Sequence, residues 1–245
     1  MRSLASPSGY ERLDGAIPIF HRSGTEKRAV AVWRLLCTGA GALSELLAVE
    51  PPELQAFVVG DEDWDEAPRE RAHAYPPGLP YFARSVWPPA LVLPVTLSPA
   101  FRPRTEATYP LIVWHDRAHA FLLQREVVRV PAWLQQFVPQ AASAGAAHRA
   151  SLPLGEHLEN IDRGPGFSIR GFGGHASTDE QMAFQNLLLL LGVAAIEEFG
   201  DKFLERLVRA LWDEKDIVDE ERAEELLANA LGTGGRAWLL SRPEF

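Results

Sequence analysis

Short apolar runs with strand chemistry mark the first 100 residues of the chain. Residues 54–59, 81–86 and 90–97 each gather apolar side chains over a length typical of a strand. Pro94 cannot donate a hydrogen bond to a neighbouring strand, so the third run is expected at an edge of the sheet or at a bulge. Edge strands matter for function, because extended peptides bind to them by adding a strand.

A helical period governs residues 25–49 and most of the chain beyond residue 105. In the first segment Val30, Trp33 and Leu36 recur at helical spacing, and two prolines follow at 51–52. Further helices are predicted over residues 106–124, 131–150, 181–199, 201–212 and 219–231. Residues 1–24 are expected to form a loose arm or short strands, 61–71 a solvated loop, and 151–178 an irregular Gly-rich segment. This order predicts an α+β fold.

Composition narrows the class of protein. The 245 residues carry 24 basic and 33 acidic side chains, a formal net charge of −9, which disfavours nucleic acid as a partner. Cys37 is the single cysteine, so no disulfide and no cysteine zinc cluster can form within the chain. The N-terminus lacks a signal-peptide pattern, and the longest apolar stretch, 187–196, is about half of a membrane span. We therefore expect no membrane partner and a cytoplasmic location.

Two histidines in the 106–124 helix carry the candidate chemistry. His115 and His119 are four residues apart, so a helix places both imidazoles on one face, where they can bind one zinc ion. Asp116 follows the first histidine, where a carboxylate can take a proton from metal-bound water. The alternative is a plain α+β domain with a coincidental histidine pair on its surface.

The surrounding sequence resembles the gluzincin branch of the zincin metallopeptidases. That family carries His-Glu-x-x-His-Ala-Phe on one helix and Pro-x-Trp-Leu-x-Glu-Gly about a turn into the next. The first element is matched by His115, His119, Ala120 and Phe121, and the second by Pro131, Trp133 and Leu134. Residues 195–204 resemble the family's later helical pair with its Tyr/Phe-Gly junction. The resemblance covers about residues 80–212.

The resemblance implies a zincin-like fold, with a small mixed sheet packed on the active-site helix and a mainly helical C-terminal half. Residues 76–245 would form this domain, and residues 1–75 would add a helix-and-strand segment to it. The resemblance further implies Zn²⁺ held by His115, His119 and the residue at 136, with Asp116 as the base that activates water. A peptide or protein substrate would lie along the strands at 81–97.

Two positions depart from the family pattern in ways that bear on activity. Asp116 replaces glutamate, which withdraws the carboxylate by about 1.5 Å from where it would meet water, enough to slow catalysis on the order of 100-fold. Gln136 replaces the glutamate ligand, which removes a negative charge from the zinc and weakens metal binding. Two functions therefore remain open: a zinc metallopeptidase with a degenerate site, or an inactive pseudo-peptidase that binds a peptide or protein partner in the cleft.

Other side chains could complete the site. Candidate replacements for the third ligand are Glu126, His148, Glu156, His157 and Glu159, each of which could equally be a solvated surface residue. His175, in a Gly-rich loop, is the candidate to bind substrate or stabilise an oxyanion, against the alternative of an ordinary loop histidine.

Overall fold

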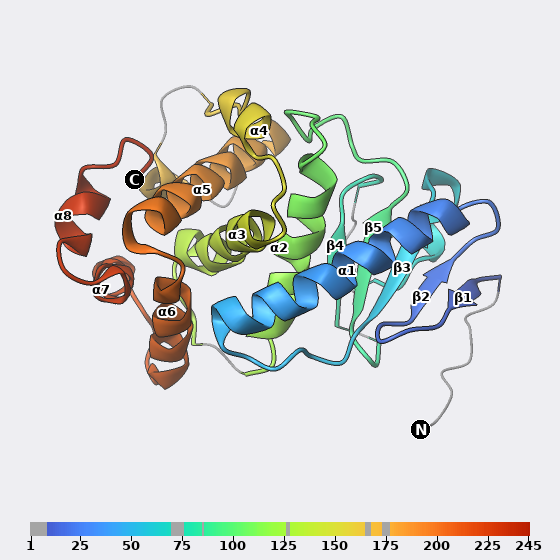
Figure 1. Cartoon of the computed structure of the whole chain (residues 1–245), viewed down its shortest axis with the longest axis horizontal. Coiled ribbons are helices and arrows are strands. Elements are labelled where there is room, and N and C mark those ends of the chain that lie inside the picture. Colours follow the sequence, from blue (N-terminus) through green and yellow to red (C-terminus); the bar gives the residue numbers. More distant parts are fainter. Residues whose placement is uncertain (1–8, 70–75, 85, 126–127, 165–167, 173–176) are drawn as a thin grey trace.

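The computed structural model describes residues 9–69, 76–84, 86–125, 128–164, 168–172 and 177–245. Its strands gather at one end of the molecule and its C-terminal helices at the other, with the long helix α1 (Glu26–Leu47) running between them (Figure 1). The α+β class predicted from the order of elements is confirmed.

A five-stranded mixed sheet carries the N-terminal end of the fold. Its strands are β1 (Glu11–Leu13), β2 (Ile19–His21), β3 (Gln55–Val59), β4 (Tyr81–Ala83) and β5 (Ala90–Pro94), in the order β1-β2-β3-β5-β4. The inner pairs β2–β3 and β3–β5 are parallel, and the outer pairs β1–β2 and β4–β5 are antiparallel. Strand β4 is therefore an edge of the sheet.

The expectation that Pro94 marks an edge or bulged strand is wrong. Strand β5 lies inside the sheet, between β3 and β4, and Pro94 is its last residue, opposite Val59. A proline at the end of a strand interrupts no bond within the ladder, and Val95 continues by donating its N–H to the carbonyl of Val59 over 2.9 Å.

Both faces of the sheet are buried, as the alternation of side chains along its strands requires. Ile19, Val58 and Leu93 belong to the main hydrophobic core beneath α1. On the opposite face, Phe20 and Phe57 stack against each other and form a smaller core with the short 3₁₀ helix η1 (Asp61–Glu66). Of the solvated loop predicted at 61–71, residues 61–66 thus form a 3₁₀ helix, and residues 70 and 71 lie outside the described part of the chain.

The helical half of the chain packs around α3 (Ala132–Arg149), most of whose residues are buried. The remaining helices are α2 (Thr108–Leu122), α4 (Gly155–Glu159), α5 (Thr178–Phe199), α6 (Lys202–Asp213), α7 (Glu220–Leu231) and α8 (Gly235–Leu240), with a 3₁₀ turn η2 (Ile169–Gly171). Helices α4 and α8 were not predicted. The close packing of α3 on α5 depends on Gly192, because a Cβ there would lie 2.8 Å from the Cα of Ala141.

Helices α1 and α5 are each long and apolar enough to cross a membrane by length and composition alone. The buried helix of a soluble protein and a signal sequence have the same features, and both helices contribute side chains to the main core of this fold. Residues 1–8 lie outside the described part of the chain. The absence of a membrane partner and the cytoplasmic location therefore stay predictions.

Candidate functional site

Helix α2 places the two histidines of the site one turn apart with their rings in contact. The ring centroids of His115 and His119 are 4.7 Å apart and the rings stand at 83° to each other. The face that carries them is fixed by Trp114, which is buried on the other side of the helix and donates its indole N–H to the carbonyl of Leu35 over 2.8 Å. A Cβ on Gly39 would lie 2.3 Å from the Trp114 ring, so this glycine lets α1 and α2 approach closely.

Helix α3 brings Gln136 to His119. Oε1 of Gln136 lies 3.2 Å from Nε2 of His119. An amide oxygen only accepts hydrogen bonds, so His119 carries its hydrogen on Nε2. The same oxygen accepts a second hydrogen bond, of 3.3 Å, from Nε2 of Gln185 on α5. Gln140 continues the chain by donating to Oε1 of Gln185 over 2.6 Å. Both lone pairs of the Gln136 oxygen are thus used within the protein.

Asp116 is turned back toward the preceding histidine. Its Oδ1 lies 3.1 Å from Nδ1 of His115, and carboxylate oxygens at this position hold Nδ1 protonated. The lone pair of His115 is then on Nε2. That nitrogen and Oδ2 of Asp116 are both buried without a hydrogen-bond partner among the described residues.

The surroundings of His119 keep its ring neutral. Burial, the neighbouring His115 and the Arg84 guanidinium together lower the pKa of His119 to about 3, and the hydrogen bond to Gln136 only partly opposes them. A neutral imidazole is the form that binds a metal, and it is also the form that donates a single hydrogen bond to an amide.

A cavity of about 220 Å³, which we call the α2–α5 cavity, opens beside His115 and Asp116. It is walled mainly by apolar side chains from α2, α5 and the segments before β4 and α2, among them Leu79, Leu111, Ile112 and Leu189. Its polar groups include Gln140, Gln185 and His157. A site of this composition suits an apolar group that is oriented by a few hydrogen bonds.

A second cavity, of about 490 Å³, opens beside His119 on the other side of the histidine pair, and we call it the arginine cavity. Arg84, Arg125 and Arg129 line it over an apolar floor from α2, α3 and α6. The two cavities lie at the two ends of strand β4. Leu79 and Pro80 before β4 line the first cavity, and Arg84 after β4 lines the second.

The residues present fit a resident zinc ion in spacing but not in donor chemistry. Two ligands of one tetrahedral zinc lie about 3.3–3.4 Å apart, close to the 3.2 Å between His119 and Gln136. The orphaned Nε2 of His115 could supply a further lone pair. The Gln136 oxygen, however, is neutral and already accepts two hydrogen bonds, so a metal would have to displace both donors without gaining a compensating charge.

The replacement ligands considered from the sequence do not gather at the histidine pair. His157 is buried in the wall of the α2–α5 cavity, where its Nδ1 lies 3.0 Å from the Thr105 hydroxyl. The other three described candidates are exposed, at the end of α3 and on α4: His148, Glu156 and Glu159. Glu126 and His175 lie outside the described residues.

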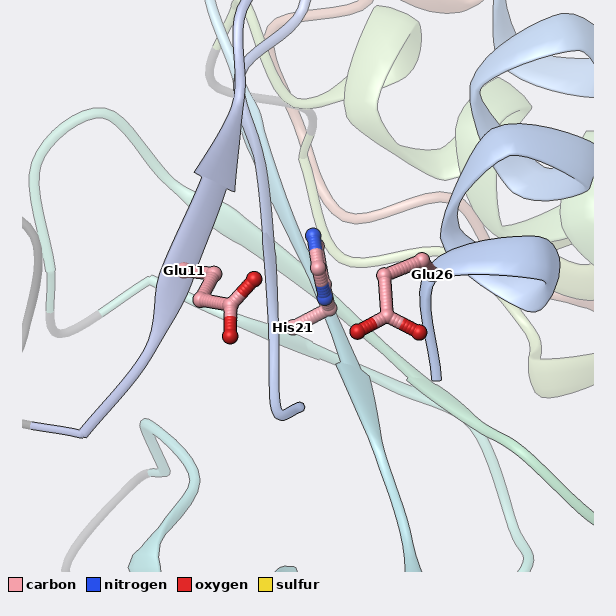
Figure 2. Close-up of side chains that lie close together, drawn as sticks. All are labelled: Glu11, His21 and Glu26. Atoms are coloured by element: carbon pink, nitrogen blue, oxygen red, sulfur yellow. The ribbon is translucent and has the colours of Figure 1, made fainter. Parts of the chain in front are cut away.

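A different group of side chains could hold a cation at the far side of the sheet. Ligand atoms of Glu11 on β1, His21 on β2 and Glu26 at the start of α1 all lie within 4.8 Å of one another (Figure 2). Both carboxylates are exposed, and two of the three side chains have a local role: His21 Nδ1 lies 3.1 Å from the Arg22 carbonyl, and Glu26 accepts the N–H of Gly24. No sequence pattern indicated this group, because its members come from three separate elements.

Sequence reasoning also missed Gln140 and Gln185. Both are uncharged, and amides without a motif carry little signal for function. One signal in the sequence could have linked Gln140 to the site. It lies four residues after Gln136, so α3 places the two amides on one face. The partner Gln185 comes from α5, and only the packing of α3 on α5 brings it to them.

Comparison with known proteins leaves the family open: no family model matches the sequence, and no curated protein matches it.

Proposed function

We propose that this chain is a pseudo-peptidase of zincin-like architecture, which binds an extended peptide or protein segment in the cleft between β4 and α2 without cleaving it. The observation that carries the proposal is the double hydrogen bond to the Gln136 oxygen, from His119 and Gln185. At the position where the gluzincin family holds a metal, this chain has amide and imidazole groups that form hydrogen bonds with one another. A satisfied buried network is stable, and opening it to admit an ion is costly.

The orientation of Asp116 supports the same conclusion. A general base must reach the proton that it removes, within about 2.6–3.2 Å. The Asp116 carboxylate instead accepts a hydrogen bond from His115, its own neighbour on α2, and so acts to orient that ring.

The edge strand β4 supports peptide binding. It pairs with β5 on one side, and no other described strand pairs with its second side. An extended segment that added to this edge would pass the histidine pair and meet a cavity at each end. The α2–α5 cavity is apolar enough to take an aliphatic or aromatic side chain of that segment.

Metal content and peptide binding test the proposal together. Protein purified without added metal is expected to contain far less than one zinc per chain, and added zinc should leave its melting temperature unchanged. Peptides selected from a random 12-residue library should bind the wild type. The Ile112→Trp substitution fills the α2–α5 cavity with a larger side chain, so it should lower the affinity for these peptides at least tenfold. Ile217→Trp is the matched control, because Ile217 is 74% exposed outside both cavities.

Zinc near one equivalent per chain that is lost in His119→Ala, together with cleavage of a selected peptide that is lost in Asp116→Ala, would overturn the proposal. That result would support the second candidate, a zinc metallopeptidase. One observation favours this candidate. The buried Nε2 of His115 has no hydrogen-bond partner among the described residues, as expected of a nitrogen that binds a metal ion. Selected peptides that bind Ile112→Trp as tightly as the wild type would contradict the α2–α5 cavity as their site.

A further inference from the structure

Basic side chains gather in the arginine cavity although the chain as a whole is acidic. Arg84, Arg125 and Arg129 line it, whereas the formal net charge of the chain is −9. None of the described lining residues is acidic. Arg125 lies over the ring of Trp212, with its guanidinium carbon 4.5 Å from the ring centroid, so its position is fixed by stacking. All three arginines are exposed around one cavity, and their combined positive charge attracts an anion.

A buried hydrogen-bond donor also borders the cavity. The indole Nε1 of Trp212 has almost no exposed area and no partner among the described residues. The donors that a ligand in the cavity can reach are therefore the guanidinium groups, which donate hydrogen bonds and accept none. The cavity therefore offers charge and donors to a group that supplies oxygen acceptors and negative charge.

The floor of the cavity shows what kind of anion fits. Apolar side chains from α2, α3 and α6 make up the rest of the lining, including Leu122, Leu134 and Leu211. An anion attached to an aliphatic stem suits such a site better than a strongly hydrated inorganic ion. A planar carboxylate also matches the two parallel N–H groups of an arginine.

We propose that the arginine cavity binds a carboxylate of the peptide that occupies the cleft. This inference rests on the proposed function, because β4 leads from the α2–α5 cavity to the arginine cavity. Pro80 and Arg84 line the two cavities and are four residues apart, which is about 13 Å in an extended strand. The preferred segment therefore carries an apolar residue and, about four positions away, either an acidic side chain or its own C-terminal carboxylate.

Matched peptides test the inference. A selected peptide is made with Glu, Gln or Lys at the position four residues from its apolar anchor, on either side, and with a free or amidated C-terminus. The Glu form should bind about tenfold tighter than the Gln form, as expected for charge-assisted hydrogen bonds, and this preference should shrink as salt is raised. A preference for the free C-terminus instead would identify the terminal carboxylate as the bound group.

Variants locate the preference. Arg125→Gln and Arg129→Gln should each reduce the Glu-over-Gln ratio to less than about twofold. Arg209→Gln is the matched control: it removes the same charge from another exposed arginine, but Arg209 pairs with Glu205 on α6 and does not line the cavity. Equal affinities for all the peptide forms, or a preference that survives both cavity variants, would overturn the inference.

A small probe separates this inference from the proposed function. N-acetylglutamate amide, titrated while the tryptophan indole N–H signals are followed by NMR, should shift one indole signal in the wild type and not in Arg129→Gln. Binding of this probe without binding of any peptide would overturn peptide binding but keep the carboxylate site. Binding of neither probe nor peptide would overturn both.

Discussion

Oε1 of Gln136 lies 3.2 Å from Nε2 of His119, about the separation of two ligands on one zinc ion, and a hydrogen atom occupies the space between them. These two atoms thus have the spacing of two metal ligands while they form a hydrogen bond with each other. Replacing the amide by a carboxylate would favour metal binding over the internal hydrogen bond. A carboxylate accepts at two oxygens and carries the negative charge that stabilises bound zinc.

Gln136→Glu is expected to create a zinc site. The new carboxylate would join His119 and the unpartnered His115 Nε2, so zinc should bind tightly enough to raise the melting temperature. At about 100 times the dissociation constant, bound zinc stabilises by about 2.7 kcal/mol, or about 5–10 °C for a chain of this size. Thermal denaturation with and without zinc measures the effect.

Gln135→Glu is the control for that experiment. It adds the same charge one residue away, on the exposed side chain that precedes the site. We expect no zinc-dependent shift in this variant. An equal shift in both variants would show that zinc binds to the added charge alone and not to the histidine pair.

The two histidines are expected to hold opposite tautomers. Asp116 accepts from Nδ1 of His115, and Gln136 accepts from Nε2 of His119, so the hydrogen is on Nδ1 in the first ring and on Nε2 in the second. Long-range proton–nitrogen NMR spectra distinguish the two forms. Replacement of Asp116 by Ala should change the NMR cross-peak pattern of the His115 ring and leave the pattern of the His119 ring unchanged. The same tautomer in both wild-type rings would contradict the described network.

The contact between α3 and α5 depends on a glycine and should not tolerate a methyl group. Gly192→Ala would place its Cβ 2.8 Å from the Cα of Ala141, so the helices must separate. We expect a loss of about 1–3 kcal/mol in the free energy of unfolding. Urea denaturation measures it.

Gly41→Ala is the control for Gly192→Ala, because the same substitution should here raise the free energy of unfolding. Gly41 is inside α1, and a Cβ there meets no atom within 4 Å. Alanine lowers the backbone entropy of the unfolded chain, so the variant should gain about 0.5–1 kcal/mol. A comparable loss in both variants would show that close packing of α3 on α5 is not what Gly192 provides.

Acid should destabilise the protein through its buried histidines before its carboxylates titrate, and His157 contributes to this together with His119, whose pKa is lowered to about 3. Burial lowers the pKa of His157 in the folded state, so the unfolded chain binds more protons as the pH falls below about 6.5. The stability that neutral His157 provides is therefore present above that pH and is lost as the pH falls toward its folded pKa. Between pH 7.5 and 5.5, His157→Gln should show a shallower decline in the free energy of unfolding than the wild type.

His148→Gln is the matched control, because His148 is exposed at the end of α3. The free energy of unfolding of this variant should fall with pH as steeply as that of the wild type. An unchanged slope in His157→Gln would mean that another group carries the acid sensitivity.

Local patterns predicted most of the secondary structure. Of the predicted apolar positions in α1, Leu36 is fully buried and Val30 and Trp33 are partly buried, and the leucines of α5 are mostly buried as an apolar helix requires. Pairing partners were not predictable, which is why Pro94 was misplaced: the sequence shows that a proline ends a run, but not which strands lie on its two sides.

The sequence by itself determined that His115 and His119 share a face of one helix, because a spacing of four residues fixes the angle between side chains wherever that helix lies. It also determined that neither Asp116 nor Gln136 is the glutamate of the resembling motif. Tertiary structure alone decided which groups meet these side chains. The hydrogen bond from Gln185 and the position of Arg84 beside the cavity at His119 join segments far apart in the chain. Their meeting depends on tertiary packing, which sums many weak contacts that a short sequence pattern does not encode.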